Sequence, residues 1–148
     1  MHAFQDFYPD ELSVCYGCGR LNDKGLHIKS YWDGEGSVCR FTPAPHHLGG
    51  NGFVYGGLIA SLIDCHGTGT AAAAAYRAEG RELGSEPKVR FVTASLHVDY
   101  KRPTPMGVEL EIRGKVAEVG ERKVVVDAEV TAGGVVTATG RVVAVRMR

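Results

Sequence analysis

The fold is decided by the stretch Gly52-Phe53-Val54-Tyr55-Gly56-Gly57-Leu58-Ile59-Ala60-Ser61-Leu62-Ile63-Asp64. It begins as a glycine-rich turn, which permits sharp backbone bends and a close approach to a ligand. After Gly57 the chain is rich in apolar helix formers, and this pattern predicts a helix over 57–77 that ends near Gly80. The helix contains a single carboxylate, Asp64, which is costly to bury unless it is paired, hydrogen-bonded or used chemically.

Two features of this stretch suggest chemistry. The first N–H groups of a helix lack intrahelical partners, so Gly56 or Gly57 can stabilise an anion or a developing oxyanion. Asp64 follows Gly56 by eight residues, which is about 12 Å of helical rise. That is too far for both to act on one atom within one chain, but it suits a site shared across a symmetric dimer. The alternative is that the stretch has no chemical role: the glycines only start the helix, and Asp64 is capped or solvated.

Two hydroxyl side chains share the helix face of Asp64. Ser61 lies three residues before it and Thr68 four residues after it. Either hydroxyl can donate to the carboxylate or contact a substrate, and the alternative is that both bond back to helix carbonyls. His66 points to the opposite side, and we expect a structural role for it.

The composition limits the possible partners. The chain has 148 residues, which suggests a single domain over 1–148, with residues 1–25 as an N-terminal extension. Lys+Arg and Asp+Glu both number 17, so bulk charge favours neither nucleic acid nor a membrane surface as a partner. The first residues lack the pattern of a secretory signal, and no apolar run is long enough to cross a bilayer. We therefore expect a cytoplasmic protein with free thiols.

Cys15-x-x-Cys18-Gly19 has the spacing of half a zinc knuckle. A full site needs two more ligands, and other Cys and His residues are candidates only in principle because none is paired at metal-like spacing. We favour a tight turn whose small thiols are packed in the interior, and we expect no metal. A redox dithiol lacks the usual strand–helix setting.

The remaining pattern is that of strands. We expect strands over 26–32 and 37–42, joined by a hairpin turn at 33–36, and then, after the helix, over 88–101, 108–119, 123–132 and 135–145. No helical crossover separates the later strands, so they form an antiparallel sheet. One helix and one sheet must cover each other, which makes the fold α+β.

Three motifs resemble those of hotdog-fold acyl-CoA thioesterases, in particular the phenylacetic-acid-degradation (PaaI-like) branch. They are the helix-start stretch above, the run from Cys15 to Leu26, which is similar to CxxCGxxNxxGL, and the strand from Thr93 that ends in Tyr100-Lys101-Arg102-Pro103. The motifs occur in the order of the family and cover most of the chain. The resemblance implies a hotdog fold, with a long central helix wrapped by a curved antiparallel sheet of five to six strands.

The resemblance also implies a function and a site. The expected activity is hydrolysis of an acyl-CoA thioester without a cofactor, in a homodimer or a dimer of dimers. Asp64 is the expected general base or nucleophile, and the Gly56 N–H is the expected oxyanion donor. The residues expected to contact the substrate are Tyr55, Gly57, Asn51, Thr68 and Ser61.

The chain departs from the family pattern at two positions. Tyr55 stands where the family often has His, and Gly49 stands where it often has Asn, although Asn51 is close by. Tyr55 can donate a hydrogen bond but cannot act as a base near neutral pH. These departures motivate an alternative, a dimer that binds acyl-CoA without hydrolysing it. A hotdog dehydratase or hydratase is disfavoured, because its His-containing catalytic motifs are absent.

Overall fold

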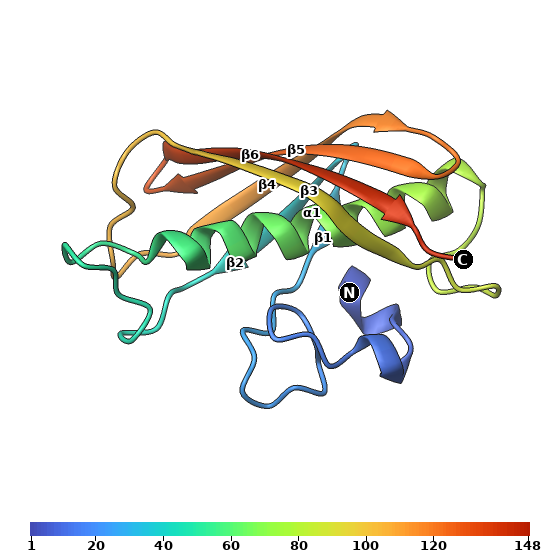
Figure 1. The fold of residues 1–148 in the computed structure, drawn as a ribbon, viewed down its shortest axis with the longest axis horizontal. Coiled ribbons are helices and arrows are strands. Elements are labelled where there is room, and N and C mark those ends of the chain that lie inside the picture. Colours follow the sequence, from blue (N-terminus) through green and yellow to red (C-terminus); the bar gives the residue numbers. More distant parts are fainter.

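The computed structural model describes residues 1–148 and contains one long helix and one six-stranded sheet (Figure 1). The elements are the short 3-10 helices η1 (Phe4–Phe7) and η2 (Asp10–Leu12), the strands β1 (Tyr31–Asp33) and β2 (Gly36–Phe41), the helix α1 (Gly56–Ala78), and the strands β3 (Phe91–Tyr100), β4 (Leu110–Val119), β5 (Lys123–Ala132) and β6 (Val135–Arg146). The strand order is β1-β2-β4-β5-β6-β3, and every neighbouring pair is antiparallel. This is the predicted hotdog arrangement.

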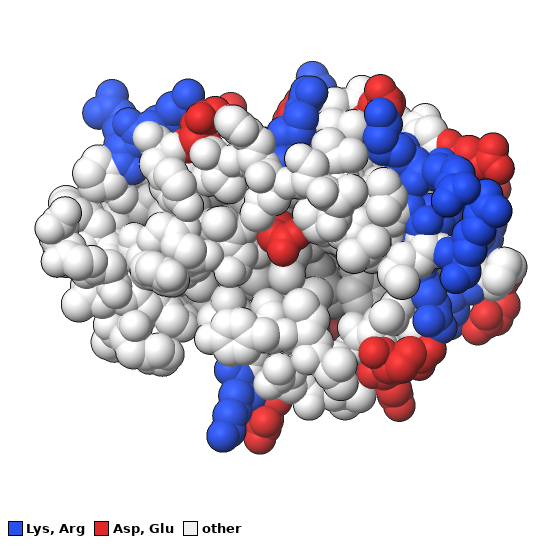
Figure 2. Space-filling model, viewed as in Figure 1, with Lys and Arg blue, Asp and Glu red and all other residues white.

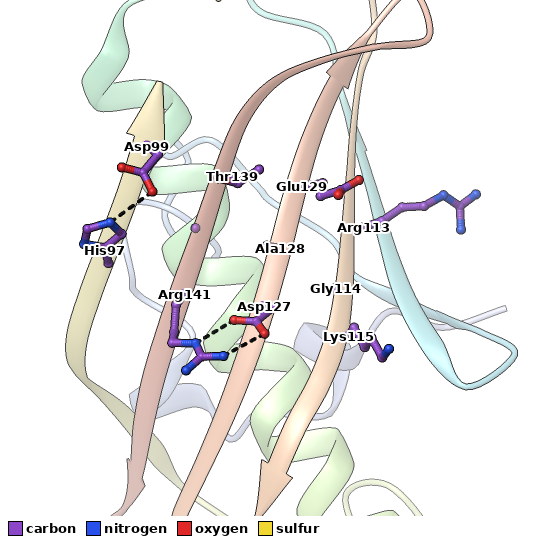
Figure 3. Close-up of a pocket in the computed structure, with 11 residues that line it drawn as sticks. His97, Asp99, Arg113, Gly114, Lys115, Asp127, Ala128, Glu129, Thr139 and Arg141 are labelled. Atoms are coloured by element: carbon purple, nitrogen blue, oxygen red, sulfur yellow. Dashed lines mark hydrogen bonds and ion pairs between the residues drawn. The ribbon is translucent and has the colours of Figure 1, made fainter. Parts of the chain in front are cut away.

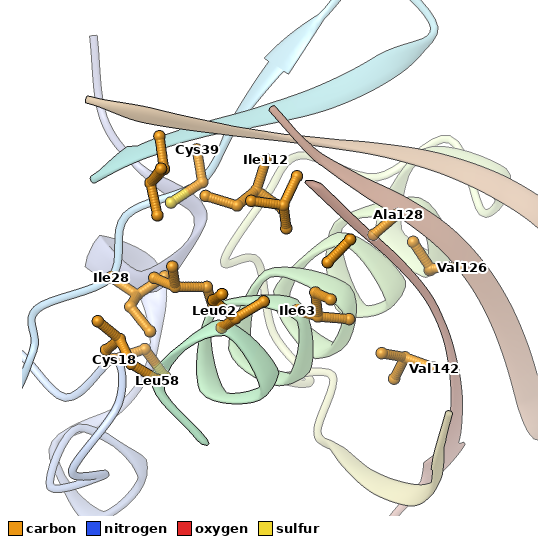
Figure 4. Close-up of a cluster of buried hydrophobic side chains, with 14 of the residues drawn as sticks. Cys18, Ile28, Cys39, Leu58, Leu62, Ile63, Ile112, Val126, Ala128 and Val142 are labelled. Atoms are coloured by element: carbon orange, nitrogen blue, oxygen red, sulfur yellow. The ribbon is translucent and has the colours of Figure 1, made fainter. Parts of the chain in front are cut away.

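Helix α1 lies in the curve of the sheet and is apolar on most sides. Leu62 and Ile63 are fully buried against side chains of the sheet such as Ile112 and Val142 (Figure 4). Burying each such aliphatic side chain stabilises the fold by roughly 1.5–3 kcal/mol. At Gly67 a side chain would collide with Val142, so glycine lets the helix approach the sheet closely.

The predicted turns are confirmed by their backbone geometry. The hairpin between β5 and β6 is closed by Gly133 and Gly134, with φ values of 57° and 80°. The φ > 0 conformation at both positions is what a tight hairpin requires. Gly80 follows the helix with φ 65°, close to the predicted end.

The first predicted strand is shorter than expected. Residues 26–32 were expected to be extended, but β1 contains only Tyr31–Asp33. The N–H groups of Leu26 and Ile28 donate instead to carbonyls of the Cys15–Cys18 turn, over 2.8 and 3.0 Å. His27, between them, has φ 55°, which interrupts an extended backbone.

The N-terminal segment, residues 1–30, covers the side of α1 that the sheet leaves open (Figure 1). Gln5 and Tyr8 of this segment lie against Gly69 of the helix. Phe4 packs edge-on against Trp32 with ring centroids 5.0 Å apart. None of the helices has the length and apolar character that crossing a membrane requires.

A buried polar network ties this segment to the helix and the sheet. His66 is fully buried, and its ring nitrogens hydrogen-bond to Ser30 Oγ over 2.8 Å and to Ser37 Oγ over 2.9 Å. Ser37 Oγ also bonds to Thr70 Oγ1 over 2.7 Å. His66 therefore has the structural role expected from its helix face. Burial lowers the pKa of His66 to about 4, because the charged imidazolium is poorly solvated there.

The lowered pKa of His66 predicts a loss of stability in mild acid. The unfolded chain takes up a proton near pH 6.5, whereas the folded chain takes it up only near pH 4. Stability must therefore fall as the pH drops from 6.5 towards 4, by about 3 kcal/mol in total from this group. Urea denaturation at pH 7, 5.5 and 4.5 measures the change.

A matched pair of variants separates this group from the others that titrate. His66→Gln keeps hydrogen-bonding capacity but cannot titrate, so the free energy of unfolding should depend less on pH over this range. Asn51→Gln, which changes an exposed side chain that does not titrate, should leave the dependence unchanged. Equal pH profiles for His66→Gln and the unaltered protein would contradict the assignment.

Candidate functional site

Asp64 lies near the middle of α1, half-buried, and points towards the start of β3. Thr93 Oγ1 donates to Asp64 Oδ1 over 2.6 Å. Thr68 Oγ1 lies 2.5 Å from Thr93 Oγ1 and donates to the backbone carbonyl of Asp64 over 2.9 Å. Thr93 of β3 thus orients the carboxylate, and Thr68 of α1 contacts Thr93.

A cavity of about 390 Å³ opens beside this carboxylate. Its wall comes from three parts of the chain: the N-terminal segment (Tyr8, Leu12, Cys15, Cys18), helix α1 (Asp64, Cys65, Thr68, Ala72) and the residues that lead into β3 (Val89 to Thr93). The lining is mostly apolar, and its charged side chains are Asp64 and Arg90. A largely apolar cavity with a few polar groups is typical of a small-molecule site.

Three thiols meet in the wall of this cavity. Cys15 Sγ lies 4.0 Å from Cys65 Sγ, and Cys18 completes a cluster whose sulfur atoms are all within 4.8 Å of one another. The hydrogen bond from Cys65, helped by backbone N–H groups, lowers the pKa of Cys15 to about 5. The same contact raises the pKa of Cys65. The expected turn is present, but only Cys18 is packed in the interior: Cys15 is exposed, which corrects the expectation, and its contact with Cys65 was not anticipated.

The start of α1 forms a second, separate cavity. Gly56 lines a groove of about 310 Å³ together with Phe53, Tyr100 and the Lys101–Arg102 pair. Tyr100 donates its hydroxyl to the Gly56 carbonyl over 2.7 Å. As the first helical residue, Gly56 has an N–H without an intrahelical acceptor. Gly56 and the carboxylate of Asp64 therefore line different cavities of one chain.

Strand β3 connects these two cavities through a β-bulge. Thr93 at its start contacts Asp64, and Tyr100 at its end contacts Gly56, so both side chains face α1. In a regular strand, residues seven apart point to opposite faces. The register with β6 shifts between Thr93 and Ser95, and this extra residue brings both side chains to the helix side.

The outer edge of β3 has no strand beside it. β3 is last in the strand order and pairs only with β6. Val92, Leu96 and Tyr100 are 45%, 39% and 54% exposed, although they are large and apolar. An unpaired edge with exposed apolar side chains is a surface suited to pairing with another strand.

The other predicted site residues, apart from Thr68, are not among those that line the two cavities. Tyr55 is 58% exposed, and its ring lies against Gly57, where a side chain would collide with it. Asn51 is exposed in the loop before the helix. Ser61 donates its hydroxyl to the Gly57 carbonyl over 2.9 Å, so it bonds back to the helix rather than to Asp64.

Sequence reasoning missed Thr93 and Tyr100 as site residues. Both lie in the strand motif quoted above, but alternation alone assigns them to opposite faces. Only a bulge signal near Ala94 could have placed them together, and the sequence contains no glycine there. Arg90 and Cys65 reach the cavity through contacts between distant segments, which the order of residues does not show.

The outer face of the sheet has a different character. A groove of about 510 Å³ lies there, on the side away from α1 (Figure 3). Its charged groups largely satisfy one another: Arg141 bonds Asp127 over 2.7 and 2.9 Å, and His97 pairs with Asp99 over 3.1 Å. Figure 2, in the view of Figure 1, shows a broad surface without charged groups apart from an acidic group near its middle, and basic groups gather at the end where the C-terminus lies. The apolar cavity beside Asp64 is therefore the stronger candidate.

The chain matches the family model of the thioesterase superfamily over residues 51–139. It is 53% identical to a thioesterase superfamily protein from Shewanella loihica, whose crystal structure superposes with a TM-score of 0.68 over 82% of this chain and 91% of that one. The Escherichia coli PaaI protein superposes with a TM-score of 0.68 over 83% of this chain and 81% of its own, at 21% identity. At that identity the likeness to PaaI is one of fold.

A curated relative adds an activity. The acyl-coenzyme A thioesterase THEM4 of Xenopus laevis is 38% identical over 93 residues, which are 63% of this chain and 36% of that protein. The rat protein of the same name is 32% identical over 93 residues, or 34% of its length. This chain therefore spans about a third of the length of these curated relatives.

The contact between Thr93 and Asp64 predicts a measurable stability difference. Thr93→Val keeps the shape of the side chain but removes the donor to the carboxylate, leaving a half-buried acceptor without its partner. We expect the free energy of unfolding to fall by about 1–2 kcal/mol in urea denaturation at pH 7.

Thr139→Val is the control, because Thr139 lies half-buried on β6, on the outer face. We expect it to change stability by less than about 0.5 kcal/mol. An equal loss in the two variants would show that the hydrogen bond to Asp64 contributes nothing specific.

Proposed function

This chain belongs to the thioesterase superfamily, and from that premise we propose that it hydrolyses an acyl-CoA thioester to a free acid and CoA. The observation that carries the proposal is the lone carboxylate of Asp64, oriented by Thr93 at the wall of an apolar cavity. The cavity suits the acyl group, and the carboxylate suits proton transfer or attack. The acyl-CoA thioesterase activity of the related THEM4 proteins supports the same substrate class.

Hydrolysis of a thioester needs a nucleophile, a group that stabilises the charged carbonyl oxygen, and departure of the thiolate. Asp64 either takes a proton from the attacking water or attacks the carbonyl itself to give an acyl-enzyme anhydride. In both routes the carbonyl oxygen becomes negatively charged, and an N–H at a helix start stabilises it by about 3–4 kcal/mol. The carbonyl is then re-formed, and CoA leaves as the thiolate and takes up a proton. In the second route, water then hydrolyses the anhydride, which releases the acid and restores the Asp64 carboxylate.

The oxyanion donor must come from a second copy of the chain, since Gly56 and Asp64 line separate cavities. A twofold pairing of β3 with its symmetry mate supplies it. Antiparallel pairing centred near Leu96 sets Tyr100 of one copy opposite the region of Val92 in the other. Because Tyr100 contacts Gly56 and Thr93 contacts Asp64, this brings the two half-sites together twice per dimer.

The same dimer supports the remaining substrate contacts. Tyr55, Gly57 and Asn51 lie at the helix start, and Lys101 and Arg102 line the groove of Gly56, where they suit the phosphates of CoA. Thr68 lies beside the carboxylate. Ser61 is a weaker candidate because its hydroxyl is bonded to the helix.

We place the protein in the cytoplasm, because its four cysteines are all free thiols. Sedimentation at several concentrations distinguishes a dimer from a dimer of dimers.

The first test removes the carboxylate. Asp64→Asn keeps the size of the side chain and can still accept from Thr93, so the fold should be retained. The assay measures the free thiol released from a panel of aryl- and alkyl-CoA esters. We expect the rate of hydrolysis to fall about 10²–10⁴-fold. Unchanged turnover would overturn the role of Asp64, and tight binding by the unaltered protein without any turnover would favour a binding protein.

The second test asks whether the site is shared between subunits. Gly56→Pro deletes the proposed donor N–H at the first helical position, where proline is well tolerated. Tyr55 before it already has φ −57° and ψ 128°, which suits a residue that precedes proline. We expect Gly56→Pro to fold, to dimerise and to be nearly inactive.

Mixing the two inactive variants then gives a decisive outcome. In a mixed dimer, one site combines Gly56 of the Asp64→Asn chain with Asp64 of the Gly56→Pro chain, and it is intact. Random reassembly makes half of the dimers mixed, so activity should return to roughly a quarter of the original value. A mixture that stays inactive after verified subunit exchange would show that the site lies within one chain.

A further inference from the structure

The three thiols beside the Asp64 cavity have an arrangement that the proposed hydrolysis does not use. Cys15 and Cys18 come from the N-terminal turn, and Cys65 comes from α1, directly after Asp64. The three sulfur atoms lie within 4.8 Å of one another, and Cys15 and Cys65 are 4.0 Å apart. In a tetrahedral zinc site with bonds of about 2.3 Å, the sulfur atoms are about 3.8 Å apart. The observed spacing needs little adjustment to reach that geometry.

The backbone holds the turn in a shape that presents both of its thiols. The Gly19 N–H donates to the Cys15 carbonyl over 2.8 Å, and the Gly17 N–H donates to Cys15 Sγ over 3.3 Å. A side chain at Gly17 would collide with Cys65 Sγ, and one at Gly19 would collide with the backbone of the turn. The turn is therefore packed directly onto the helix at the thiols.

The two sides of this turn differ in their surroundings. Its outer residues Val14 and Tyr16 are 60% and 62% exposed, whereas Cys18 is buried in the core cluster, so the Cys18 side of the turn faces the interior. The turn forms one wall of the cavity that contains Asp64. A cross-link between the turn and α1 would fix the shape of that wall.

We propose that Cys15, Cys18 and Cys65 bind one thiophilic metal ion, with Zn²⁺ as the ion of choice, and that this ion fastens the N-terminal segment to α1. Soft thiolates in a tetrahedral arrangement select zinc over magnesium or calcium. All three cysteines line the cavity, from which a water can reach the ion as its fourth ligand. Asp64 does not belong to the cluster, so the carboxylate stays available for chemistry.

The proposal differs from the expectation drawn from the Cys15-x-x-Cys18 motif alone, which found no third ligand. Sequence spacing cannot show that Cys65, 47 residues beyond Cys18, reaches the turn. A disulfide between Cys15 and Cys65 is the competing use of the same thiols, and the test below separates the two.

The test measures metal directly and does not depend on hydrolysis. The full chain is purified under reducing conditions without chelator, and its zinc is quantified by mass spectrometry. We expect about one zinc per chain. Replacing zinc by Co²⁺ should give the visible bands of tetrahedral cobalt and a sulfur-to-cobalt charge-transfer band in the near ultraviolet.

The variants assign the ligands. Cys15→Ser changes an exposed side chain, so it should fold normally and weaken zinc binding by about 100-fold or more. Cys65→Ser should also fold and should weaken zinc binding by a similar factor. Cys39→Ala is the control, because Cys39 is the one remaining cysteine and lies buried on β2, outside the cluster; it should keep its zinc and its cobalt spectrum.

Hydrogen exchange then tests the structural role. Removing zinc with a chelator should speed amide exchange in residues 13–28 and leave the sheet unchanged. Equal zinc in Cys15→Ser and Cys39→Ala, no zinc in the unaltered protein after reconstitution with Zn²⁺, or a Cys15–Cys65 disulfide that persists under the reducing conditions would each overturn the proposal. None of these outcomes bears on whether Asp64 hydrolyses a thioester.

Discussion

The burial of α1 is the constraint on which the rest of the structure depends. The helix carries apolar or small side chains around most of its circumference, from Leu58 to Tyr76, so it is stable only if it is covered on nearly all sides. The curved sheet covers one side, and the N-terminal segment covers another. The interior polar groups, His66 with Ser30 and Ser37, are tolerated because they satisfy one another. The remaining side, near β3, is where Asp64 is placed.

The chemistry follows from how this last side is built. A carboxylate on a covered helix needs a partner, and Thr93 at the start of β3 provides one. The bulge after Thr93 lets the far end of the same strand return to the helix start, where Tyr100 contacts Gly56. One edge strand thus contacts both Gly56 and Asp64, which are about 12 Å apart along the helix. Its free edge is suited to pairing with a second strand, as the proposed dimer requires.

The N-terminal segment has a role beyond covering the helix. It supplies one wall of the cavity, and its thiol turn contacts α1 at the residue after the proposed catalytic carboxylate. A group that fastens this turn would therefore influence the shape of the acyl site without taking part in the reaction. The outer face of the sheet is a weaker candidate, since its groove is lined mainly by polar and charged groups, of which Arg141 is already paired with Asp127.

The sequence by itself determined the elements and the chemical groups. The glycine-rich helix start, the single carboxylate, the four long strands and the hairpin at Gly133-Gly134 depend on local periodicity and backbone freedom, which the order of residues expresses directly. Tertiary structure alone decided which groups meet. The late start of β1, the bulge that turns Thr93 and Tyr100 to one face, and the approach of Cys65 to the Cys15–Cys18 turn all arise from packing between distant segments. Such contacts depend on how the covered helix fits its surroundings, and no local pattern records that fit.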